Sequence, residues 1–299
     1  MEDLFTRTLS PGELAQIVGV SQSSIRRWVD DGVIDVTRTT GGHRRILLYE
    51  ALRFIREQGM PVLRPELLGV PELGSRASAE RVGPLTGDVL FRLLQDGEAA
   101  KARGAIVGAF VDGMSLASLF DGPIARALAQ IGTLWKHSEE GIFVEHVATG
   151  VCLEAVNRLR VLLPPPSSSA PVALGGAPSG DPYLLPSLMA ATVVAGIGYR
   201  DVNLGPDTPT AAFLHAADVH RPALVWLTVT GHLGGDDVVR AVREIVVPLQ
   251  ARGARVVVGG QGAAVHREQW PADVAFLRSM EELETLATTH RAGAASSAS

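Results

Sequence analysis

A run of prolines and serines, LLPPPSSSAP from Leu162 to Pro171, places the strongest constraint on how this chain folds. Such a segment is too rich in proline and serine to pack, so it predicts a linker, which we assign to residues 164–171. Apolar residues recur at helical spacing before this run, whereas short apolar stretches alternate with helix-length segments after it. The chain is therefore predicted to contain domains of different classes.

Residues 83–163 are predicted to form a bundle of four helices. Their helical periodicity is interrupted only at Gly97, around Asp112-Gly113 and at Glu140-Gly141. Long helical segments with short connections are typical of an up-and-down bundle.

Residues 172–291 are predicted to form an α/β domain with a parallel sheet. Five short apolar runs alternate with helix-length segments: VALGG at 172, DVNLG at 201, ALVWLTVTG at 223, RVVVGG at 255 and DVAFL at 273. Buried parallel strands joined by crossover helices show this pattern. Glycines at the strand ends would let the tail of a ligand approach the backbone, at the edge where open α/β sheets bind ligands. The last residues, 292–299, are predicted to be a disordered tail.

Residues 1–60 are predicted to form a winged helix-turn-helix. Ser10, Pro11 and Glu13 form a helix-start signature, and Ser21 begins a second helix, SQSSIRRWVDDG. The run VIDVTRTTGGHRRILLYEALRFI then indicates a strand, a Gly-Gly turn, a second strand and a further helix. Three prolines follow in GMPVLRPELLGVPEL, which predicts a boundary and a linker over 61–82.

Basic residues in this segment indicate DNA binding, although the formal net charge of the whole chain is −5. Taken alone, Arg26 and Arg27 favour a solvated helix face. The adjacent stretch from Arg38 to Arg45 contains three arginines, one histidine and no acidic residue, which suits phosphate contacts and reverses that interpretation. The residues that we expect at DNA are Gln22, Ser23, Arg26, Arg27, Arg38, His43, Arg44 and Arg45.

The wing sequence TTGGHRRI, from Thr39 to Ile46, resembles the TPGGHRRY-like wing of MerR-type DNA-binding domains. The resemblance covers about 60 residues and implies that a dimer contacts double-stranded, palindromic operator DNA through the arginines of the second helix and the wing. No aromatic residue follows the Ser10 cap, as the family opening would have it, so the half-site preference does not transfer.

A second motif lies in the helical bundle, where nine residues separate Trp135 from Glu145-His146. Taken alone, Trp135 would be a core residue, and Glu145 and His146 would be solvated. However, the order of a MerR-type head, a four-helix bundle with Trp-x9-Glu-His and a Rossmann-like α/β domain resembles the cobalamin-dependent photoreceptor repressors of carotenoid synthesis. The resemblance implies that these residues cover the upper face of cobalamin (adenosyl- or methyl-type), held between the bundle and the α/β domain.

The α/β domain departs from this family at the ligand below cobalt. The family carries Asp/Glu-x-His-x-x-Gly after the first strand, whereas this chain reads SGDPYLLPSL from Ser179, with Asp181 at the acidic position, Tyr183 at the histidine position and Pro186 at the glycine position. A neutral phenol is a poor cobalt ligand, so histidine-ligated cobalamin is not expected. The cofactor contacts that we expect are Trp135, Glu145, His146, Asp181, Tyr183, Thr228, Thr230, Gly259, Gly260 and Gln261.

Three interpretations of the effector remain open. Cobalamin could bind in another coordination state, the pocket could hold a tetrapyrrole or another flat apolar molecule, or it could be empty and serve oligomerisation as a dimer or tetramer. His215, His220 and His232 are alternative ligands, of which only His232 follows a predicted strand, and a surface histidine is the simpler interpretation.

Other classes of protein fit the sequence less well. A single cysteine, Cys152, and the lack of a long apolar run argue against secreted disulfide scaffolds and membrane spans. The N-terminus does not resemble a secretory signal, so we expect a cytoplasmic protein. An enzyme is not expected either, because a cobalamin enzyme would need a substrate barrel, and Gly259-Gly260-Gln261-Gly262 lacks the Lys-Ser/Thr of a phosphate-binding loop.

Overall fold

The structure is a computed structural model that describes residues 4, 6–77, 84–135, 139–230, 235–265, 267–270 and 274–297. The chain divides into two compact units, Met1–Pro164 and Pro165–Ser299, which are described separately. The division falls within the proline- and serine-rich run 162–171. None of the described helices is long and apolar enough to cross a membrane.

The first unit begins with the expected winged helix-turn-helix. The Ser10 hydroxyl accepts a hydrogen bond from the Glu13 backbone N–H (3.2 Å), and the Glu13 carboxylate accepts one from the Ser10 N–H (2.6 Å), which fixes the start of the first helix. Gly19 ends that helix with a left-handed φ of 72°. The strands pair antiparallel in the order β1-β3-β2. The elements are β1 (Thr8–Leu9), α1 (Pro11–Val18), α2 (Gln22–Asp30), β2 (Thr37–Arg38), β3 (Arg44–Leu47) and α3 (Leu48–Glu57).

The segment 61–82, predicted as a linker, differs from that prediction. It contains the 3-10 helix η1 (Pro65–Leu68) and α4 (Pro71–Ala77), and residues 78–83 lie outside the described ranges. Leu68, Val70 and Leu73 are buried, and α4 packs against α6 (Ala99–Val111). Pro65 and Pro71 stand at the first position of each helix, where a missing N–H is tolerated, so they start helices instead of breaking them.

The bundle forms as predicted, with one boundary shifted. Helix α5 (Gly87–Gln95) precedes α6, and the breaks at Gly97 and Asp112-Gly113 are confirmed. The break expected at Glu140-Gly141 is wrong, because α9 (Glu139–Val161) runs through both residues. A glycine inside a helix costs only about 1 kcal/mol, which packing of the long α9 against α6 and α8 (Ala125–Trp135) can offset.

A π-helical turn, η2 (Phe120–Ile124), joins α7 (Leu116–Leu119) to α8 without a loop. Pro123 lies inside this turn, and Phe120 and Ile124 are fully buried. Because proline has no backbone N–H, it fits a place where the regular hydrogen-bond ladder is already interrupted.

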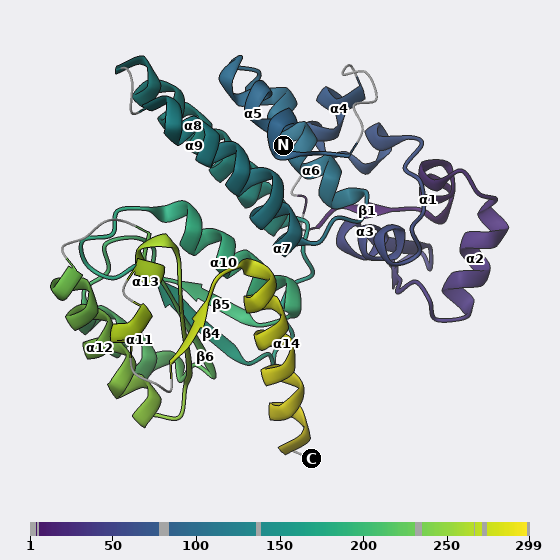
Figure 1. The fold of residues 1–299 in the computed structure, drawn as a ribbon. Coiled ribbons are helices and arrows are strands. Elements are labelled where there is room, and N and C mark those ends of the chain that lie inside the picture. The colour runs from purple at the N-terminus through teal and green to yellow at the C-terminus, as the bar shows by residue number, and fades with distance from the viewer. Residues whose placement is uncertain are drawn as a thin grey trace. The chain divides into compact units, whose positions relative to one another are not determined.

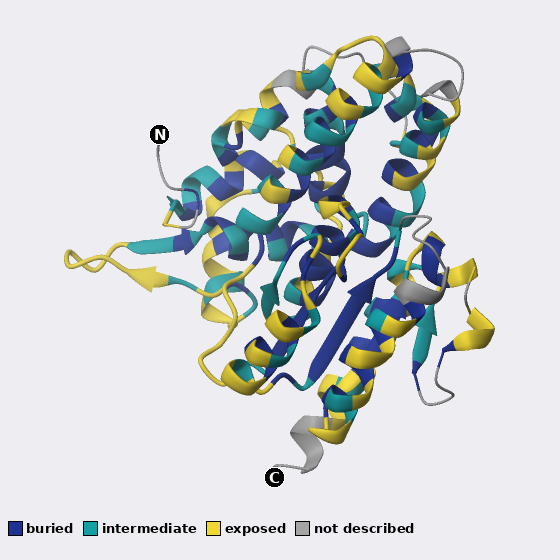
Figure 2. Cartoon of the chain, turned by 90° about the vertical axis from the view of Figure 1, so that its left-hand side faces the viewer, coloured by how far each residue is buried: buried dark blue, intermediate teal, exposed yellow. Residues whose placement is uncertain are grey.

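The second unit is a five-stranded parallel sheet of order β5-β4-β6-β7-β8. This order reverses direction between β4 and β6, which is the point where doubly wound folds bind ligands. The central strands are deeply buried (Figure 2). The strands are β4 (Val172–Gly176), β5 (Arg200–Asn203), β6 (Leu224–Thr228), β7 (Arg255–Gly259) and β8 (Ala275–Leu277), which confirms the five predicted runs.

Helices cover both faces of this sheet (Figure 1). One face and its helices α11 and α12 form an apolar core that includes Leu174, Phe213 and Leu227. The other face carries Trp226 and packs against α10, on which α14 lies. The helices are α10 (Leu184–Ile197), α11 (Thr210–His220), α12 (Gly235–Ala251), α13 (Gln261–Val265), the 3-10 helix η3 (Arg267–Gln269) and α14 (Met280–Ser297).

The predicted disordered tail at 292–299 is wrong for residues 292–297, because α14 continues to Ser297. The helix is already established from Met280, and alanine, the strongest helix former, recurs in this stretch. Residues 298–299 lie outside the described ranges.

We predict that Cys152 is chemically silent in the folded protein. Its side chain is fully buried on α9, and burial raises the pKa of the thiol to about 12. Since the thiolate is the reactive form, a disulfide reagent at mildly alkaline pH should label it only after denaturant is added. Labelling of the native protein without loss of helical circular dichroism would contradict this.

Candidate functional site

The second helix of the head, α2, presents a polar and basic face. Ser21 caps it by accepting a hydrogen bond from the Ser24 N–H (3.1 Å). Ile25 is fully buried, and the Trp28 ring lies 5.2 Å from that of Phe54 on α3. The opposite side is exposed and carries the predicted residues Gln22, Ser23, Arg26 and Arg27. The helix therefore has the apolar anchor and free polar face that a DNA recognition helix requires.

The wing is an exposed hairpin that carries the other predicted basic residues, with the arginines on its paired strands and His43 in its turn. Arg38 pairs with Arg44, and the Thr39 N–H donates to the His43 carbonyl (3.0 Å). Gly42 closes the turn with a left-handed φ of 76°. The hairpin stands out from the body of the molecule in Figure 2. Its arginines are thus available to a nucleic-acid backbone.

Two wing arginines face acidic groups that the sequence analysis did not identify. Arg44 forms an ion pair with Asp30 at the end of α2 (2.7 Å), and Arg45 lies 3.9 Å from Glu13 of α1. These pairs are exposed, so each contributes little to stability. They hold the arginine side chains beside the helix-turn-helix, and DNA phosphates would compete with the carboxylates for them. The count of charges from Arg38 to Arg45 missed them because both acids lie elsewhere in the sequence.

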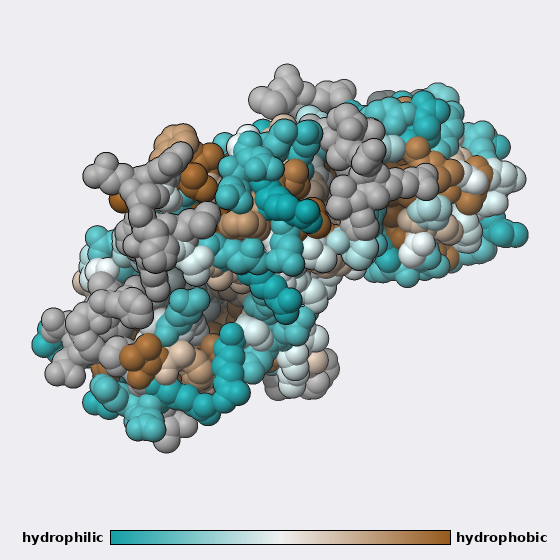
Figure 3. All heavy atoms as spheres, turned by 45° about the horizontal axis from the view of Figure 1, so that its top comes forward, coloured by the Kyte–Doolittle hydropathy of each residue, from teal (hydrophilic) through white to brown (hydrophobic). Residues whose placement is uncertain are grey.

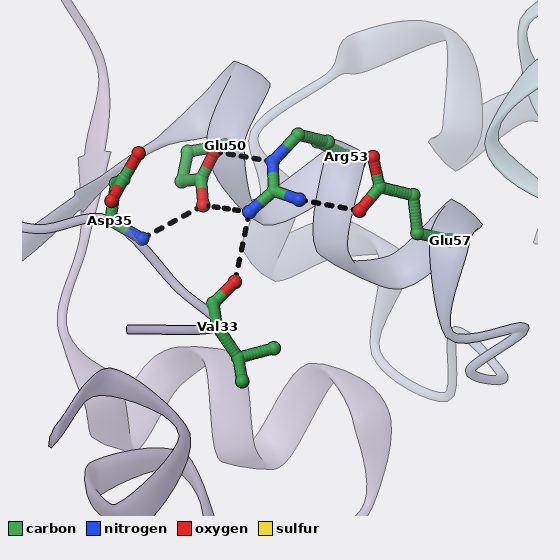
Figure 4. A network of polar contacts seen from close by, with 5 residues as sticks. All are labelled: Val33, Asp35, Glu50, Arg53 and Glu57. Carbon is green, nitrogen blue, oxygen red and sulfur yellow. Dashed lines mark hydrogen bonds and ion pairs between the residues drawn. The ribbon is translucent and has the colours of Figure 1, made fainter. Parts of the chain in front are cut away.

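A polar network fixes the base of the wing (Figure 4). The buried Glu50 carboxylate accepts hydrogen bonds from the Asp35 N–H (2.8 Å) and from Arg53 (2.8 Å at Nε). Arg53 also donates to the Val33 carbonyl (2.9 Å) and pairs with Glu57. Hydrogen bonding to Glu50 raises the pKa of Arg53, so its guanidinium stays charged. The network anchors the loop between α2 and the wing to α3.

We predict that Arg44→Ala and Arg45→Ala weaken binding to all duplex sequences. Each lost phosphate contact should lower the slope of log affinity against log salt concentration by about 0.9. Fluorescence anisotropy with a labelled duplex at several salt concentrations measures both quantities. Arg103→Ala, which breaks the ion pair with Glu154 inside the bundle, is the control. Unchanged affinity and slope in the wing variants would exclude this surface from DNA binding.

The Trp-x9-Glu-His motif spans the end of α8 and the first turns of α9. Trp135 is the last residue of α8, and the conformation of its side chain lies outside what the structure describes. Glu145 is half-buried and His146 is exposed. The same turns expose Ile142, Phe143 and Val147, of which Phe143 is 70% exposed. Spacings of three and four residues bring these side chains toward one side of α9. The sequence analysis missed these apolar residues, although they directly flank the motif.

The face of the molecule drawn in Figure 3 is largely hydrophilic where it is coloured, and its hydrophobic residues are gathered in a few places.

The loops at the carboxyl edge of the sheet are joined by Asp181. Its side chain is fully buried, and its carboxylate accepts hydrogen bonds from the N–H groups of Tyr183 (3.1 Å) and Thr230 (2.5 Å). Its carbonyl accepts from the Asp207 N–H (2.8 Å), and the Asp207 carboxylate accepts from the Gly180 N–H (2.7 Å). Asp181 therefore bridges the loops after β4 and β6, at the switch point of the sheet.

The other predicted cofactor residues of the second unit lie at this same edge but differ in exposure. Tyr183 caps α10 with its side chain 45% exposed, beside the exposed Leu184. Thr228 is buried, and the Thr230 hydroxyl is buried with no hydrogen-bond partner among the described residues. Gln261 is exposed at the start of α13.

The glycines at the end of β7, Gly259 and Gly260, allow neighbouring backbone segments to pack closely against them. A Cβ at Gly260 would lie 2.3 Å from the carbonyl oxygen of Val229, and one at Gly259 would lie 3.1 Å from that of Leu277. Neither glycine therefore faces open space on the side where a Cβ would stand.

Neither of the two described alternative histidine ligands lies at this edge. His215 lies in the middle of α11, and His220 ends that helix. Because crossover helices begin at the carboxyl edge of a parallel sheet, His220 lies toward the opposite edge. His232 lies outside the described residues. In the described parts of these strand-end loops, no imidazole stands in for the missing histidine.

We predict that Asp181→Asn destabilises the second unit by about 1–3 kcal/mol, because an amide can accept only one of the two buried N–H groups. Chemical denaturation followed by circular dichroism measures the change. Asp218→Asn is the matched control, since that aspartate forms an exposed ion pair with Arg252 and should change stability little. Equal stabilities of the two variants would refute the bridging role.

Comparisons with known proteins match the head and the bundle to two different family models. Residues 10–46 match the MerR family regulatory protein model, and residues 87–160 match the B12 binding domain model. The chain is 24% identical over 298 residues to the HTH-type transcriptional repressor CarA of Myxococcus xanthus, covering 92% of this chain and 95% of the repressor.

Among solved structures, the fold is similar to the monomethylamine corrinoid protein of Methanosarcina barkeri. The TM-score is 0.51 at 16% identity, over 67% of this chain and 95% of that protein, which supports the fold alone. The predicted winged helix-turn-helix, helical bundle and Rossmann-like α/β fold are thereby confirmed. By these matches the chain contains a MerR-type DNA-binding segment and a B12-binding domain.

Proposed function

We propose that this protein is a transcriptional regulator that binds double-stranded operator DNA and responds to cobalamin. The observation that carries the proposal is the exposed basic wing beside the polar face of α2, in the same compact unit as the bundle that matches a B12 binding domain. In this role the protein would act in the cytoplasm, and a dimer or tetramer would place its wings on a palindromic operator.

In the DNA-bound state, α2 would enter the major groove and the wing would contact the backbone. Gln22, Ser23 and Arg26 stand at the start of the exposed face, where base edges are read. Arg38, His43, Arg44 and Arg45 would supply phosphate contacts. Arg27 lies on the same face and would add to the positive potential.

The described residues fit contact with a corrinoid better than ligation of its cobalt. The exposed apolar turn of α9, with Glu145 and His146, suits a large flat ligand, and Trp135 is proposed to join it. In the second unit, Tyr183 and Leu184 offer apolar surface, and the unpartnered Thr230 hydroxyl could donate a hydrogen bond. Nitrogen ligation has no support there, because Tyr183 stands at the histidine position.

When bound, adenosyl- or methylcobalamin would supply a cobalt–carbon bond that light breaks, which would give the regulator its signal. The residues of this chain would hold the cofactor, exclude water from its upper face and pass on the change in occupancy. Asp181 would keep the loops after β4 and β6 in place beneath it.

The route from the bundle to DNA is proposed to pass through Arg56. This residue of α3 donates to the carbonyls of Phe110 and Met114 (3.1 Å for Met114), at the end of α6. Its guanidinium also lies 3.8 Å from the centre of the Phe110 ring. Helix α6 packs against α9, so movement of α9 upon ligand binding would reach α3 and the wing.

We predict that the protein retains cobalamin through gel filtration and that its operator affinity depends on cobalamin and on light. The absorbance spectrum of the protein incubated with adenosyl- or methylcobalamin, followed by DNA binding in darkness and after illumination, tests this. A tetrapyrrole spectrum from the purified protein would indicate a changed ligand. Oligomers without any chromophore, and DNA binding indifferent to cobalamin, would indicate an empty effector domain.

Substitution of Phe143 and Trp135 locates the binding surface. Each change to Ala should weaken cobalamin binding about tenfold, because a large aromatic face is lost from the contact. Val247→Ala, at an exposed valine of α12, is the control and should leave affinity unchanged. If the aromatic variants change stability but not ligand retention, the α9 surface is not the cap.

A further inference from the structure

We propose that cobalamin is held with its own benzimidazole base still on cobalt and with its nucleotide tail outside the α/β core, because Trp226 fills the space that a displaced tail would need. This inference rests on the proposed function and specifies how the cofactor binds. It makes Trp226 a residue that determines which form of the cofactor is accepted.

A protein ligand can replace the base only if the base and its tail move elsewhere. With the corrin ring at the carboxyl edge of the sheet, the tail would have to enter one of the two layers between the sheet and its helices. Side chains fill both of these layers.

The layer under α11 and α12 is filled by hydrocarbon. Leu174, Phe213 and Leu227 are at most 1% exposed and belong to one continuous cluster. A polar nucleotide would have to displace close-packed side chains there, which is costly.

The layer under α10 is filled by the Trp226 indole, which is 2% exposed. Trp226 of β6 pairs in register with Gly175 of β4, and a Cβ at Gly175 would lie 2.1 Å from the indole ring. The ring therefore lies directly on the backbone of β4 at Gly175.

Hydrogen bonds lock the indole in this position. Its Nε1–H donates to the Ser187 hydroxyl of α10 (3.4 Å), and that hydroxyl donates to the side-chain amide oxygen (Oδ1) of Asn203 on β5 (2.7 Å). The Gly205 N–H donates to the same oxygen (3.1 Å). Ser187 is fully buried, so the chain of donors and acceptors is closed inside the protein.

The residues at the carboxyl edge of the sheet independently support a base that stays on cobalt. Both oxygens of Asp181 are engaged by backbone N–H groups, and Tyr183 presents an exposed phenol in place of an imidazole. Among the described residues, this unit therefore offers neither a nitrogen at the edge of the sheet to replace the base nor a place for its tail. The exposed Tyr183 ring and Leu184 at the start of α10 can instead contact the base from outside.

Electron paramagnetic resonance of bound cob(II)alamin tests the proposal. Uniformly ¹⁵N-labelled protein is mixed with unlabelled cob(II)alamin, and the splitting from the nitrogen on cobalt is recorded. We expect the triplet of the cofactor's own ¹⁴N. A doublet would mean that a protein nitrogen is the ligand, and a spectrum without splitting would mean that the base has left cobalt; either result overturns the proposal.

Two further measurements use the same protein. Tyr183→His should keep the triplet, because the displaced base would still have no place to go, and a doublet would refute the role of Trp226. Cobinamide, which lacks the nucleotide and the base, should bind within about tenfold of cobalamin, and a larger loss would show that the core holds the tail. If neither corrinoid is retained, the proposed cobalamin response fails together with this inference, whereas retention with a doublet refutes the inference alone.

Discussion

The arrangement of the first unit depends on one half-buried cation, Arg56. Burial lowers the pKa of its guanidinium from the ordinary value, yet arginine remains charged in proteins. The loss of hydration is offset by the carbonyls at the end of α6, where the helix dipole is negative, and by the Phe110 ring. A neutral or shorter side chain would leave those carbonyls unpaired. The head and the bundle are therefore held together by a polar contact of fixed geometry, which has to break or shift as a whole.

The second unit uses its polar groups differently. Asp181, Asp207 and Asn203 are all occupied by hydrogen bonds within the protein, at or below the edge where an α/β fold binds its ligand. At that edge Tyr183 and Leu184 are exposed and present aromatic and aliphatic surface. Such a surface favours recognition by shape over recognition by coordination, which agrees with the replacement of histidine by tyrosine.

Local signals in the sequence were sufficient for the elements and their order. The Ser10 capping box, the alternation of apolar runs after Pro171 and the Gly-Gly wing each act over a few residues, and the structure reproduces them. The packed segment 61–77 was missed because a proline at a helix start and a proline in a linker look alike without the partner surface. The helical end of α14 was missed because alanine and serine are common to both helices and tails.

Contacts between distant residues could not be read from the sequence. The pairs Arg44–Asp30 and Arg45–Glu13 depend on how the wing folds back on α1 and α2. Trp226 looks like any apolar residue of a buried strand, and only its register beside Gly175 shows that it fills a layer of the core.

Because of the π-helical turn at Phe120–Ile124, the packing of the bundle's third helical segment depends on its exact number of residues. It accommodates one residue more than a regular helical turn, so everything after it is rotated by about 100° relative to an uninterrupted helix. Deleting one residue there would restore regular geometry but turn Ala127 and Ile131, both fully buried, away from the core. A change in the length of this segment would therefore have to be matched by a new set of buried positions along α8.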